Sequence, residues 1–311
     1  MRLKWLLKNK IKKRNEMSLF KFDDRVVIKI SGPDGLTFLQ GLLTCNISPL
    51  KEEKKIVYGA FLNAKGKFIT DVFVLRVSAE AGQDLVLYLD CMKAHIADIF
   101  LKLKTFRLRS KVTLELKDQI HVYGCFESDS PINSVGAVDP RSIDLGFRIY
   151  TEEELKCDEA GYGSYKKACI QNFIAFGYDA LLYEKSFIME FGFEQWEAVS
   201  FSKGCYLGQE LTASMHYRKL AKREVVWLKS ESFKDQELVG SGVALNDSVV
   251  GRVLNQEDAY LLLHLHKNVM DEVSRREKTD SNKEILFFET DLILDKCNDL
   301  CINQVYRRIS I

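Results

Sequence analysis

Hydrophobic and polar positions alternate over short stretches along most of the chain, and in a few places apolar residues recur every three to four positions. The first pattern is typical of strands and the second of amphipathic helices. This mixture favours an α+β body over a doubly wound parallel sheet. We expect helices over residues 36–43, 93–106 and 163–177, and a shorter one that begins near Gly208 and reaches Arg218. We expect strands over residues 25–30, 57–63, 68–77, 84–90, 111–116 and 120–126.

The pattern changes after a basic linker, residues 217–223. Short apolar runs, separated by polar loops, then predict strands over residues 224–229, 248–254, 259–266 and 283–295. Such a series indicates a small all-β domain. We therefore place the body at residues 17–221, with an internal division open near 125–145, and the C-terminal domain at residues 222–311.

The first sixteen residues form a separate, basic segment. They contain seven Lys or Arg and one acidic residue. An amphipathic surface helix and a mitochondrial presequence are both open, although the segment is rich in Lys and has no Ser, which is unusual for a presequence. Its apolar residues are too few and too interrupted to span a membrane. We expect residues 1–16 to be a disordered extension, with the folded chain starting at Met17.

Composition and charge narrow the classes of function. The 311 residues carry a net charge of +1 and are 46% hydrophobic, as in an ordinary globular protein. Without a strong positive field, we expect neither direct binding to nucleic acid nor attachment to a membrane. The eight cysteines include no C-x-x-C pair and no secretory signal is visible, so we expect free thiols and a cytoplasmic protein. Cys297 and Cys301 are expected to be a surface pair rather than a metal site.

One acidic residue stands out in the second predicted strand. If residues 68–77 alternate regularly, Asp71 shares a face with Ile69, Phe73 and Leu75. An unpaired carboxylate on such a face would be costly. Asp71 is therefore expected to have a hydrogen-bonding partner, to lie at the mouth of a site, or both.

The stretch with the most chemistry is Lys203-Gly-Cys-Tyr-Leu-Gly-Gln-Glu210. It places Cys205 next to a lysine and between two glycines, which permit unusual torsions and close approach of another molecule. A thiol acts as a nucleophile or a metal ligand only as the thiolate, and a neighbouring Lys or a helix N-terminus favours that form. A buried cysteine in a tight turn is the plain alternative, because free cysteines are often buried.

This stretch resembles the signature of the YgfZ-type folate-binding proteins. The flanking Val199-Ser-Phe-Ser and Leu211-Thr-Ala, together with His216, are similar to the branch of that family that helps to assemble iron–sulfur clusters. One position departs from the pattern: Ser214 stands where that branch usually has Arg, and whether Arg218 substitutes is open. The segment 138–148, with its "DPR" and "LGFR", also recurs in the family, and a purely structural role in a turn is equally open there.

The resemblance covers nearly all of residues 18–270 and implies a T-protein-like fold, that of the glycine-cleavage aminomethyltransferase. That fold has an α+β body around a central folate cavity and a C-terminal β-barrel. The segment around Glu190 resembles the part of folate-dependent aminomethyltransferases whose acid holds the pterin ring of tetrahydrofolate or a derivative. A carboxylate can accept from an amino group and a ring N–H that lie side by side. The further folate-binding positions that we expect are Asn63, Asp71, Gly204, Tyr206, Gly208, Gln209 and Glu210.

The function that the resemblance implies is assistance in the assembly or repair of iron–sulfur clusters in client enzymes, with an indirect effect on tRNA modification. Cys205 would be the working thiol, either bridging a cluster with a partner or taking part in redox chemistry, and Lys203 would favour its thiolate. A single thiolate suits iron–sulfur ligation but cannot hold a cluster alone. We therefore expect a transient cluster that Cys205 shares with a partner, an A-type cluster carrier or a client enzyme.

Two other functions are weighed against this one. A true aminomethyltransferase needs an acid beside the reactive folate nitrogen. The T-protein pattern there is Asn-x-x-Gly-Gly-x-x-Asp-Asp, whereas this chain has Lys67 for the second glycine and Thr70 for the first acid. A nucleic-acid-modifying protein is the other alternative, and the nearly neutral charge argues against it.

Overall fold

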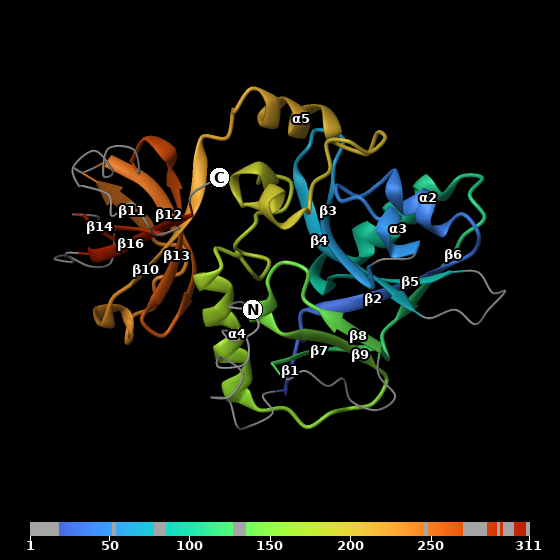
Figure 1. The fold of residues 1–311 in the computed structure, drawn as a ribbon, viewed down its shortest axis with the longest axis horizontal. Helices are drawn as coiled ribbons and strands as arrows, with labels where there is room; N and C mark the ends of the chain where they lie inside the picture. The colour runs from blue at the N-terminus through green and yellow to red at the C-terminus, as the bar shows by residue number, and fades with distance from the viewer. Residues whose placement is uncertain are drawn as a thin grey trace, which may run out of the picture.

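The computed structural model describes residues 19–51, 54–77, 85–126, 135–245, 248–269, 285–290, 293–294 and 302–308. Three antiparallel sheets organise this part of the chain, two in the body and one at the opposite end of the molecule (Figure 1). The expected extension 1–16 and the pair Cys297 and Cys301 lie outside the described residues. None of the helices in the described ranges is long and apolar enough to cross a membrane.

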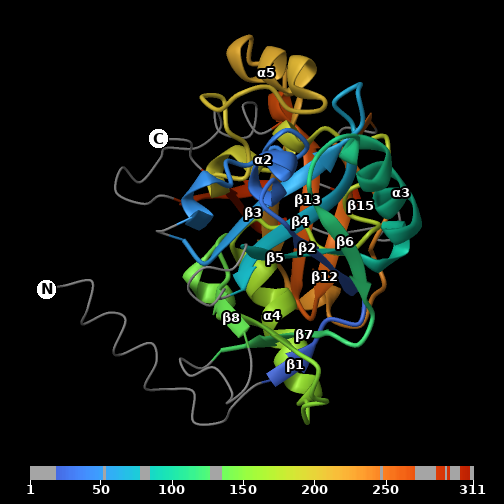
Figure 2. The ribbon, with the colours of Figure 1, turned by 90° about the vertical axis from the view of Figure 1, so that its right-hand side faces the viewer.

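The larger body sheet has five strands in the order β3-β4-β5-β2-β6. Two helices, α2 (Gly35–Gln40) and α3 (Ile96–Arg107), cover one of its faces (Figure 2). Phe38 of α2 and Leu103 of α3 pack there against buried residues from four of the strands, so this face forms a core of its own. The strands are β2 (Arg25–Ser31), β3 (Ile56–Leu62), β4 (Phe68–Val77), β5 (Val86–Met92) and β6 (Thr113–Lys117).

The smaller body sheet has four strands in the order β1-β7-β9-β8. One more helix, α4 (Glu159–Gln171), packs against it and also contacts the C-terminal sheet. The strands are β1 (Leu19–Lys21), β7 (His121–Cys125), β8 (Val135–Val138) and β9 (Phe147–Thr151). Short 3₁₀ helices connect these elements at Ser48–Lys51, Lys93–His95, Ile143–Leu145, Ile188–Glu190, Phe193–Trp196 and Glu231–Phe233.

The C-terminal sheet follows α5 (Gln209–Tyr217) and has seven strands in the order β14-β16-β10-β13-β12-β11-β15. Its two edge strands do not pair with each other in the described residues, so the expected closed barrel is not confirmed and the sheet is open there. The division of the chain at residue 222 stays a prediction. The strands are β10 (Arg223–Lys229), β11 (Gly242–Leu245), β12 (Ser248–Glu257), β13 (Tyr260–His266), β14 (Ile285–Thr290), β15 (Ile293–Leu294) and β16 (Ile302–Arg308).

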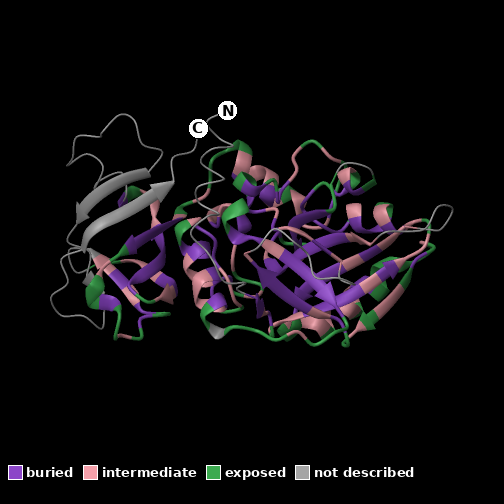
Figure 3. Ribbon diagram, turned by 60° about the horizontal axis from the view of Figure 1, so that its bottom comes forward, coloured by how far each residue is buried: buried purple, intermediate pink, exposed green. Residues whose placement is uncertain are grey.

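One hydrophobic core joins all three sheets. Buried residues line the contact between the body and the C-terminal sheet (Figure 3). Phe73 of β4, Tyr165 of α4 and Trp227 of β10 belong to the same cluster. Burial of such large side chains stabilises a fold by about 1.5–3 kcal/mol each. The C-terminal sheet is therefore packed onto the body through apolar contacts.

The helix expected at residues 163–177 lies four to six residues earlier, at Glu159–Gln171. The side chain of Asp158 accepts a hydrogen bond from the amide of Ala160, which is the usual way to begin a helix. At the other end Phe173 has a φ of 61°, in the left-handed region that a continuing helix excludes. Phe173 and Phe176 lie beyond the helix. The hydrophobic pattern there reflects their packing in the core and not helical structure.

The regular alternation expected in residues 68–77 is also broken. Phe61 pairs with Thr70 but Leu62 pairs with Phe68, so a bulge lies at Ile69. A bulge turns one residue to the other side of the sheet. Ile69 accordingly packs in the core under α2 and α3, whereas Phe73 packs in the central core.

Candidate functional site

Cys205 lies on an exposed loop that leads into α5, and its side chain is exposed. The alternative of a buried cysteine in a tight turn is therefore wrong. The loop is held at its base, because the amide of Ser200 donates to the carbonyl of Thr44 at 2.9 Å and the amide of Leu207 donates to that of Gly41 at 3.2 Å. The thiol is thus presented to solvent by a segment fixed at both sides.

Lys203 was expected to favour the thiolate of Cys205, but its ammonium group has other contacts. Its ammonium group donates to the carbonyl oxygens of Gln40, Leu43 and Cys45 at 2.7, 2.5 and 2.9 Å. Burial lowers the pKa of Lys203 to about 8. All three N–H donors of the ammonium group are used by backbone, and none of these contacts is with Cys205. The structure therefore gives Lys203 the role of anchoring the loop, and the priming of the thiol by Lys203 is not supported.

The two glycines of the motif differ. Gly208, with a φ of 81°, begins α5, and a Cβ there would lie 2.6 Å from the carbonyl oxygen of Asn63. Only glycine permits this approach of the loop to the turn between β3 and β4. A Cβ on Gly204 would meet no atom within 4 Å, so the described chain does not require a glycine at that position.

Of the remaining motif residues, Gln209 and Tyr206 help to order the loop and Glu210 is exposed. The side chain of Gln209 accepts from the amide of Tyr206 at 3.3 Å, and so it orders the loop. Tyr206 is buried, and the Lys203 ammonium lies 4.8 Å from its ring centroid. Glu210 is exposed in the first turn of α5, where the helix dipole favours a negative charge.

The far end of α5 packs on the same loop. The ring of His216 stacks on that of Phe201 at 3.8 Å between centroids, and its Nδ1 lies 2.9 Å from a carboxylate oxygen of Glu194. Tyr217 beside it is 69% exposed. The residues around the signature thus form one surface unit, with Cys205 before the helix and Tyr217 at its end.

Glu190 lies where the body meets the C-terminal sheet, and its side chain is 12% exposed. Its two oxygens have only long contacts. One accepts from the amide of Lys222 at 3.3 Å, and the other lies 3.5 Å from Nε2 of His264. The carboxylate therefore keeps hydrogen-bonding capacity.

His264, which the sequence did not single out, completes this environment. Burial, together with the nearby charges of Arg223, Arg252 and His266, lowers the pKa of His264 to about 3. The ring is therefore neutral, and its contact with Glu190 is not an ion pair. Its Nε2 is buried and has no hydrogen-bond partner in the described chain. The only sequence signal was a histidine inside the apolar run of residues 260–266.

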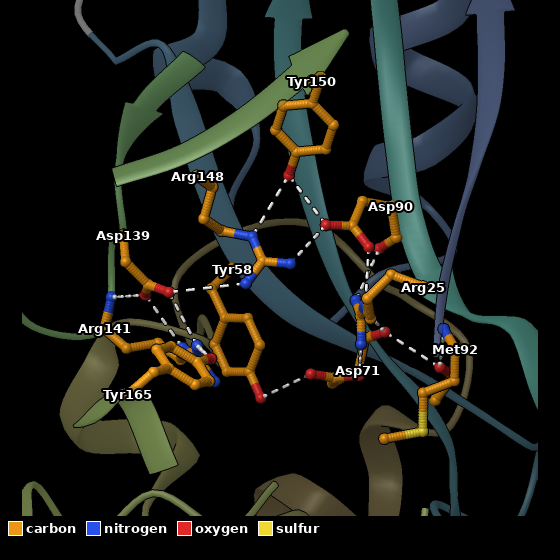
Figure 4. Close-up of polar contacts among 11 residues, drawn as sticks. Arg25, Tyr58, Asp71, Asp90, Met92, Asp139, Arg141, Arg148, Tyr150 and Tyr165 are labelled. Carbon is orange, nitrogen blue, oxygen red and sulfur yellow. Dashed lines mark hydrogen bonds and ion pairs between the residues drawn. The ribbon is translucent and has the colours of Figure 1, made fainter. Parts of the chain in front are cut away.

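Asp71 has the hydrogen-bonding partner that was expected, but this partner belongs to a buried network and not to the mouth of a site. It belongs to a buried network of three arginines and three aspartates between the two body sheets (Figure 4). Arg25 donates to Asp71 at 2.5 Å and to Asp90 at 2.6 Å, and the Tyr58 hydroxyl lies 3.3 Å from Asp71. Asp71 is thus bound on both carboxylate oxygens by protein groups.

Asp90 is the centre of this network. Burial alone would raise the pKa of Asp90, but the guanidinium groups of Arg25 and Arg148 hold it below its usual range. Arg148 and the Tyr150 hydroxyl both reach its second oxygen, at 2.7 and 2.9 Å. The sequence offered one signal, an acid at the end of the apolar strand 85–90.

The family-like segment 138–148 supplies the rest of the network. Arg141 donates to both oxygens of Asp139, at 3.0 and 2.7 Å, and to the hydroxyl of Tyr165 at 2.7 Å. These groups join the smaller sheet to α4. The structural alternative for this segment is the one that the geometry supports.

Asn63 also serves the backbone. Its side-chain oxygen accepts from the amides of Lys65 and Lys67, both at 3.0 Å, and its amide group donates to Glu184 at 3.3 Å. Asn63, Asp71 and Glu190 thus have separate partners and do not converge. Neither the cleft beside Phe38 and Phe106 nor the cleft beside Phe20 and Tyr162 is lined by any of these three residues or by Cys205. The expected central folate cavity is not confirmed.

The described residues hold no group of three or more His, Cys, Asp or Glu side chains that could bind a metal ion. Among the described residues, Cys205 therefore belongs to no such group.

Comparison with known proteins gives relatives for the sequence. No protein-family model matches the chain. It is 31% identical over 217 residues to a protein of Pyricularia oryzae named "Iron-sulfur cluster assembly factor IBA57 homolog, mitochondrial", which covers 65% of this chain and 54% of that protein. It is 30% identical over 225 residues to the protein of the same name from Mycosarcoma maydis, which covers 67% of this chain and 56% of that protein. The chain thus spans little more than half the length of these curated relatives.

A solved structure gives a neighbour for the fold. The glycine cleavage system aminomethyltransferase T from Bartonella henselae superposes with a TM-score of 0.60 and 12% identity, over 98% of this chain and 88% of that one. Likeness at this identity shows the fold alone. It confirms the mixed α and β fold of T-protein type.

The expectation of a cytoplasmic protein is wrong. The relatives are named as mitochondrial proteins, which points to the mitochondrion. The inference failed because free thiols indicate only a reducing compartment, and they do not say which one.

Proposed function

Because this chain is a relative of the YgfZ-type proteins, a family that includes iron–sulfur cluster assembly factors, we propose that it assists the assembly or repair of iron–sulfur clusters in client enzymes. The observation that carries the proposal is the exposure of Cys205 on an anchored loop. We place this activity in the mitochondrion, and its effect on tRNA modification is indirect, through enzymes that contain clusters.

The chemistry assigned to Cys205 is that of a shared ligand. A thiolate is a soft ligand that suits iron, and a cluster needs more ligands than one residue offers. The described residues hold no group of three or more His, Cys, Asp or Glu side chains that could bind a metal ion. The cluster is therefore cargo that Cys205 holds together with a partner, and an A-type cluster carrier has the thiolates to complete the set. Lys203 and Gln209 keep the loop in place while the thiol stays accessible.

The test is Cys205→Ser, with Cys157→Ser as the matched control, because Cys157 is also exposed. Each variant is mixed under anaerobic conditions with a cluster-loaded A-type carrier, and the complex is followed by its cluster absorption. We expect the control to form the complex and Cys205→Ser to lose it. In cells that lack the protein, Cys205→Ser should fail to restore the activity of cluster enzymes. Full restoration would refute the role of the thiol.

Tetrahydrofolate or a derivative is the small molecule that we propose for the same protein, with Glu190 as its anchor. Glu190 has only long contacts and lies beside the unpartnered Nε2 of His264, so donors and acceptors are free there. These two residues fit a pterin edge, whereas Asn63 and Asp71 are bound elsewhere and do not. A bound tetrahydrofolate would supply one-carbon chemistry on its ring nitrogens. Glu190 would hold and orient the pterin ring.

Calorimetric titration with tetrahydrofolate tests this second part. Glu190→Gln should weaken binding about ten- to a hundredfold, since charge-assisted hydrogen bonds are worth about 1.5–3 kcal/mol. Glu197→Gln, an exposed acid nearby in sequence, is the control and should bind as the unmodified protein does. Equal binding by both variants would remove Glu190 from the site. The aminomethyltransferase alternative is disfavoured, because Asp71 is bound by Arg25 and Tyr58 and is not free to transfer a proton.

A further inference from the structure

A second site is indicated by a cleft between the body and the C-terminal sheet, which neither Cys205 nor Glu190 lines. The cleft has a volume of about 560 Å³. Its walls come from β1, the turn after it, the start of α4, the loop at 176–179 and strand β12. Pockets for small molecules have volumes of about 300–1,000 Å³ and often lie at such junctions. The cleft is therefore of the right size and in the right kind of place for a ligand.

The charge of the cleft is strongly negative. Asp23, Asp24, Asp158 and Asp179 line it, and Lys21 is the one basic residue of the lining. The lining thus carries three more negative than positive charges. Like charges gathered in one cleft repel each other, and a cation that enters would relieve this repulsion.

Three of these carboxylates are available. Asp158 is occupied as the cap of α4. Asp23, Asp24 and Asp179 have no side-chain hydrogen bond or ion pair with any described residue. Burial raises the pKa of Asp24, as for a carboxylate that lacks a counter-ion, although Arg25 opposes this effect. Asp23 and Asp24 are consecutive in the turn after β1, and Asp179 comes from the loop at 176–179.

Aromatic side chains share the lining of the cleft with the acids. Phe20, Tyr162, Phe176 and Tyr178 line the same cleft. The ring of Tyr162 already accepts a cation, because the Lys166 ammonium lies 5.4 Å from its centroid. The side chain of Asn255 bonds to both the amide and the carbonyl of Phe176, at 3.1 and 2.8 Å, so this wall is fixed in advance.

We propose that this cleft binds a linear aliphatic polyamine. Ammonium groups joined by methylene chains can pair with carboxylates on two segments, Asp23 and Asp24 on one and Asp179 on the other, and the aromatic faces suit both parts of such a molecule. A cation with one charge would leave most of the acidity uncompensated. A basic peptide is a different class of ligand, and the volume of the cleft favours the small molecule. This proposal does not rest on the function proposed above, and neither Cys205 nor Glu190 lines the cleft.

The test is a calorimetric titration of the full chain with spermidine. Asp24→Asn and Asp179→Asn should each weaken binding about tenfold, since each loses one charge-assisted contact. Asp118→Asn makes the same charge change at an exposed position outside the cleft and should leave binding unchanged. Asp179 is exposed, so its variant tests the site even if Asp24→Asn does not fold. Putrescine, with two ammonium groups, should bind more weakly than spermidine.

Three results would overturn the proposal. The first is the lack of saturable binding with a stoichiometry of one. The second is an equal loss in Asp118→Asn and in the two cleft variants, which would show attraction to overall charge alone. The third is binding of an oligolysine peptide that is tighter than that of spermidine and is lost in Asp24→Asn, which would assign the cleft to a protein partner.

Discussion

The centre of the body and the Cys205 loop use charged residues in opposite ways. In the centre, three arginines and three aspartates are buried and are bonded to one another. On the loop, the half-buried ammonium group of Lys203 bonds to backbone carbonyls, and the thiol of Cys205 stays exposed. The ion pairs of the first region join two sheets, whereas the lysine of the second holds a loop that presents a cysteine. In these two regions the buried charges stabilise the fold, and the exposed thiol carries the proposed chemistry.

The strongest way to test this comparison is to break the network at its centre. Asp90→Ala leaves Arg25 and Arg148 without their shared carboxylate, and removal of one partner of a buried ion pair costs about 3–5 kcal/mol. Urea unfolding should show a loss of that size in the free energy of unfolding. Asp118→Ala, an exposed acid, should change it by less than about 0.5 kcal/mol. A loss below about 1 kcal/mol in Asp90→Ala would mean that the network is not structural.

The next largest loss in the free energy of unfolding is expected when Lys203, the anchor of the loop, is replaced. Lys203→Met removes the donor shared by three carbonyl groups, and we expect a loss of about 2–3 kcal/mol because half-buried carbonyls are then only partly hydrated. The exposed Lys219→Met is the control. If Lys203 instead primes the thiol, Lys203→Met would slow alkylation of Cys205 and leave the free energy of unfolding nearly unchanged. The two measurements together decide which role is correct.

The sequence predicted β2 to β7 well, because apolar runs bounded by turns mark them, and β3 is buried on both faces. It did not predict the short strands β1 and β8. It failed where tertiary contacts override local pattern. The bulge at Ile69 reverses the face of one residue, and the left-handed Phe173 ends α4 early. The local hydrophobic pattern of the sequence contains no signal for the bulge or for the left-handed residue.

The candidate site was predicted in part. The signature correctly identified an exposed cysteine before a helix, since the glycine at 208 and the helical spacing after it are visible in the sequence. The partners of Lys203 could not be predicted, because they are main-chain carbonyls about 160 positions away. The partners of Asn63 and Asp71 could not be predicted for the same reason, since a side chain's hydrogen-bond partners depend on the packing of distant segments.

A smaller effect on the free energy of unfolding is expected from His264, which lies beside Glu190. The ordinary pKa of histidine is 6.5, and that of His264 in the folded chain is about 3. The unfolded chain therefore takes up a proton between these values and the folded chain does not. The contribution of His264 to the free energy of unfolding is fully present above about pH 6.5. It is lost as the pH falls towards 3, and the loss between pH 7.5 and 5 is about 2 kcal/mol.

Chemical unfolding at both pH values measures this loss. His264→Phe keeps a ring against Phe191, with which His264 stacks at 4.4 Å, and removes the titration. The variant should lose about 2 kcal/mol less than the unmodified protein on going from pH 7.5 to 5. The same loss in both proteins would show that His264 is charged in the folded chain.

The smallest effect on stability is expected at Cys205, the residue with the largest expected effect on function. Its side chain is exposed, so Cys205→Ser should change the free energy of unfolding by less than about 0.5 kcal/mol. Cys91→Ser, which puts a hydroxyl in a fully buried position on β5, should cost about 1–3 kcal/mol. Brief alkylation of the native protein, mapped by mass spectrometry, should modify Cys205 and Cys157 but spare Cys91. If Cys91 were modified as fast as Cys205, the body would open as readily as the loop, and the contrast between an occupied interior and a free surface thiol would fail.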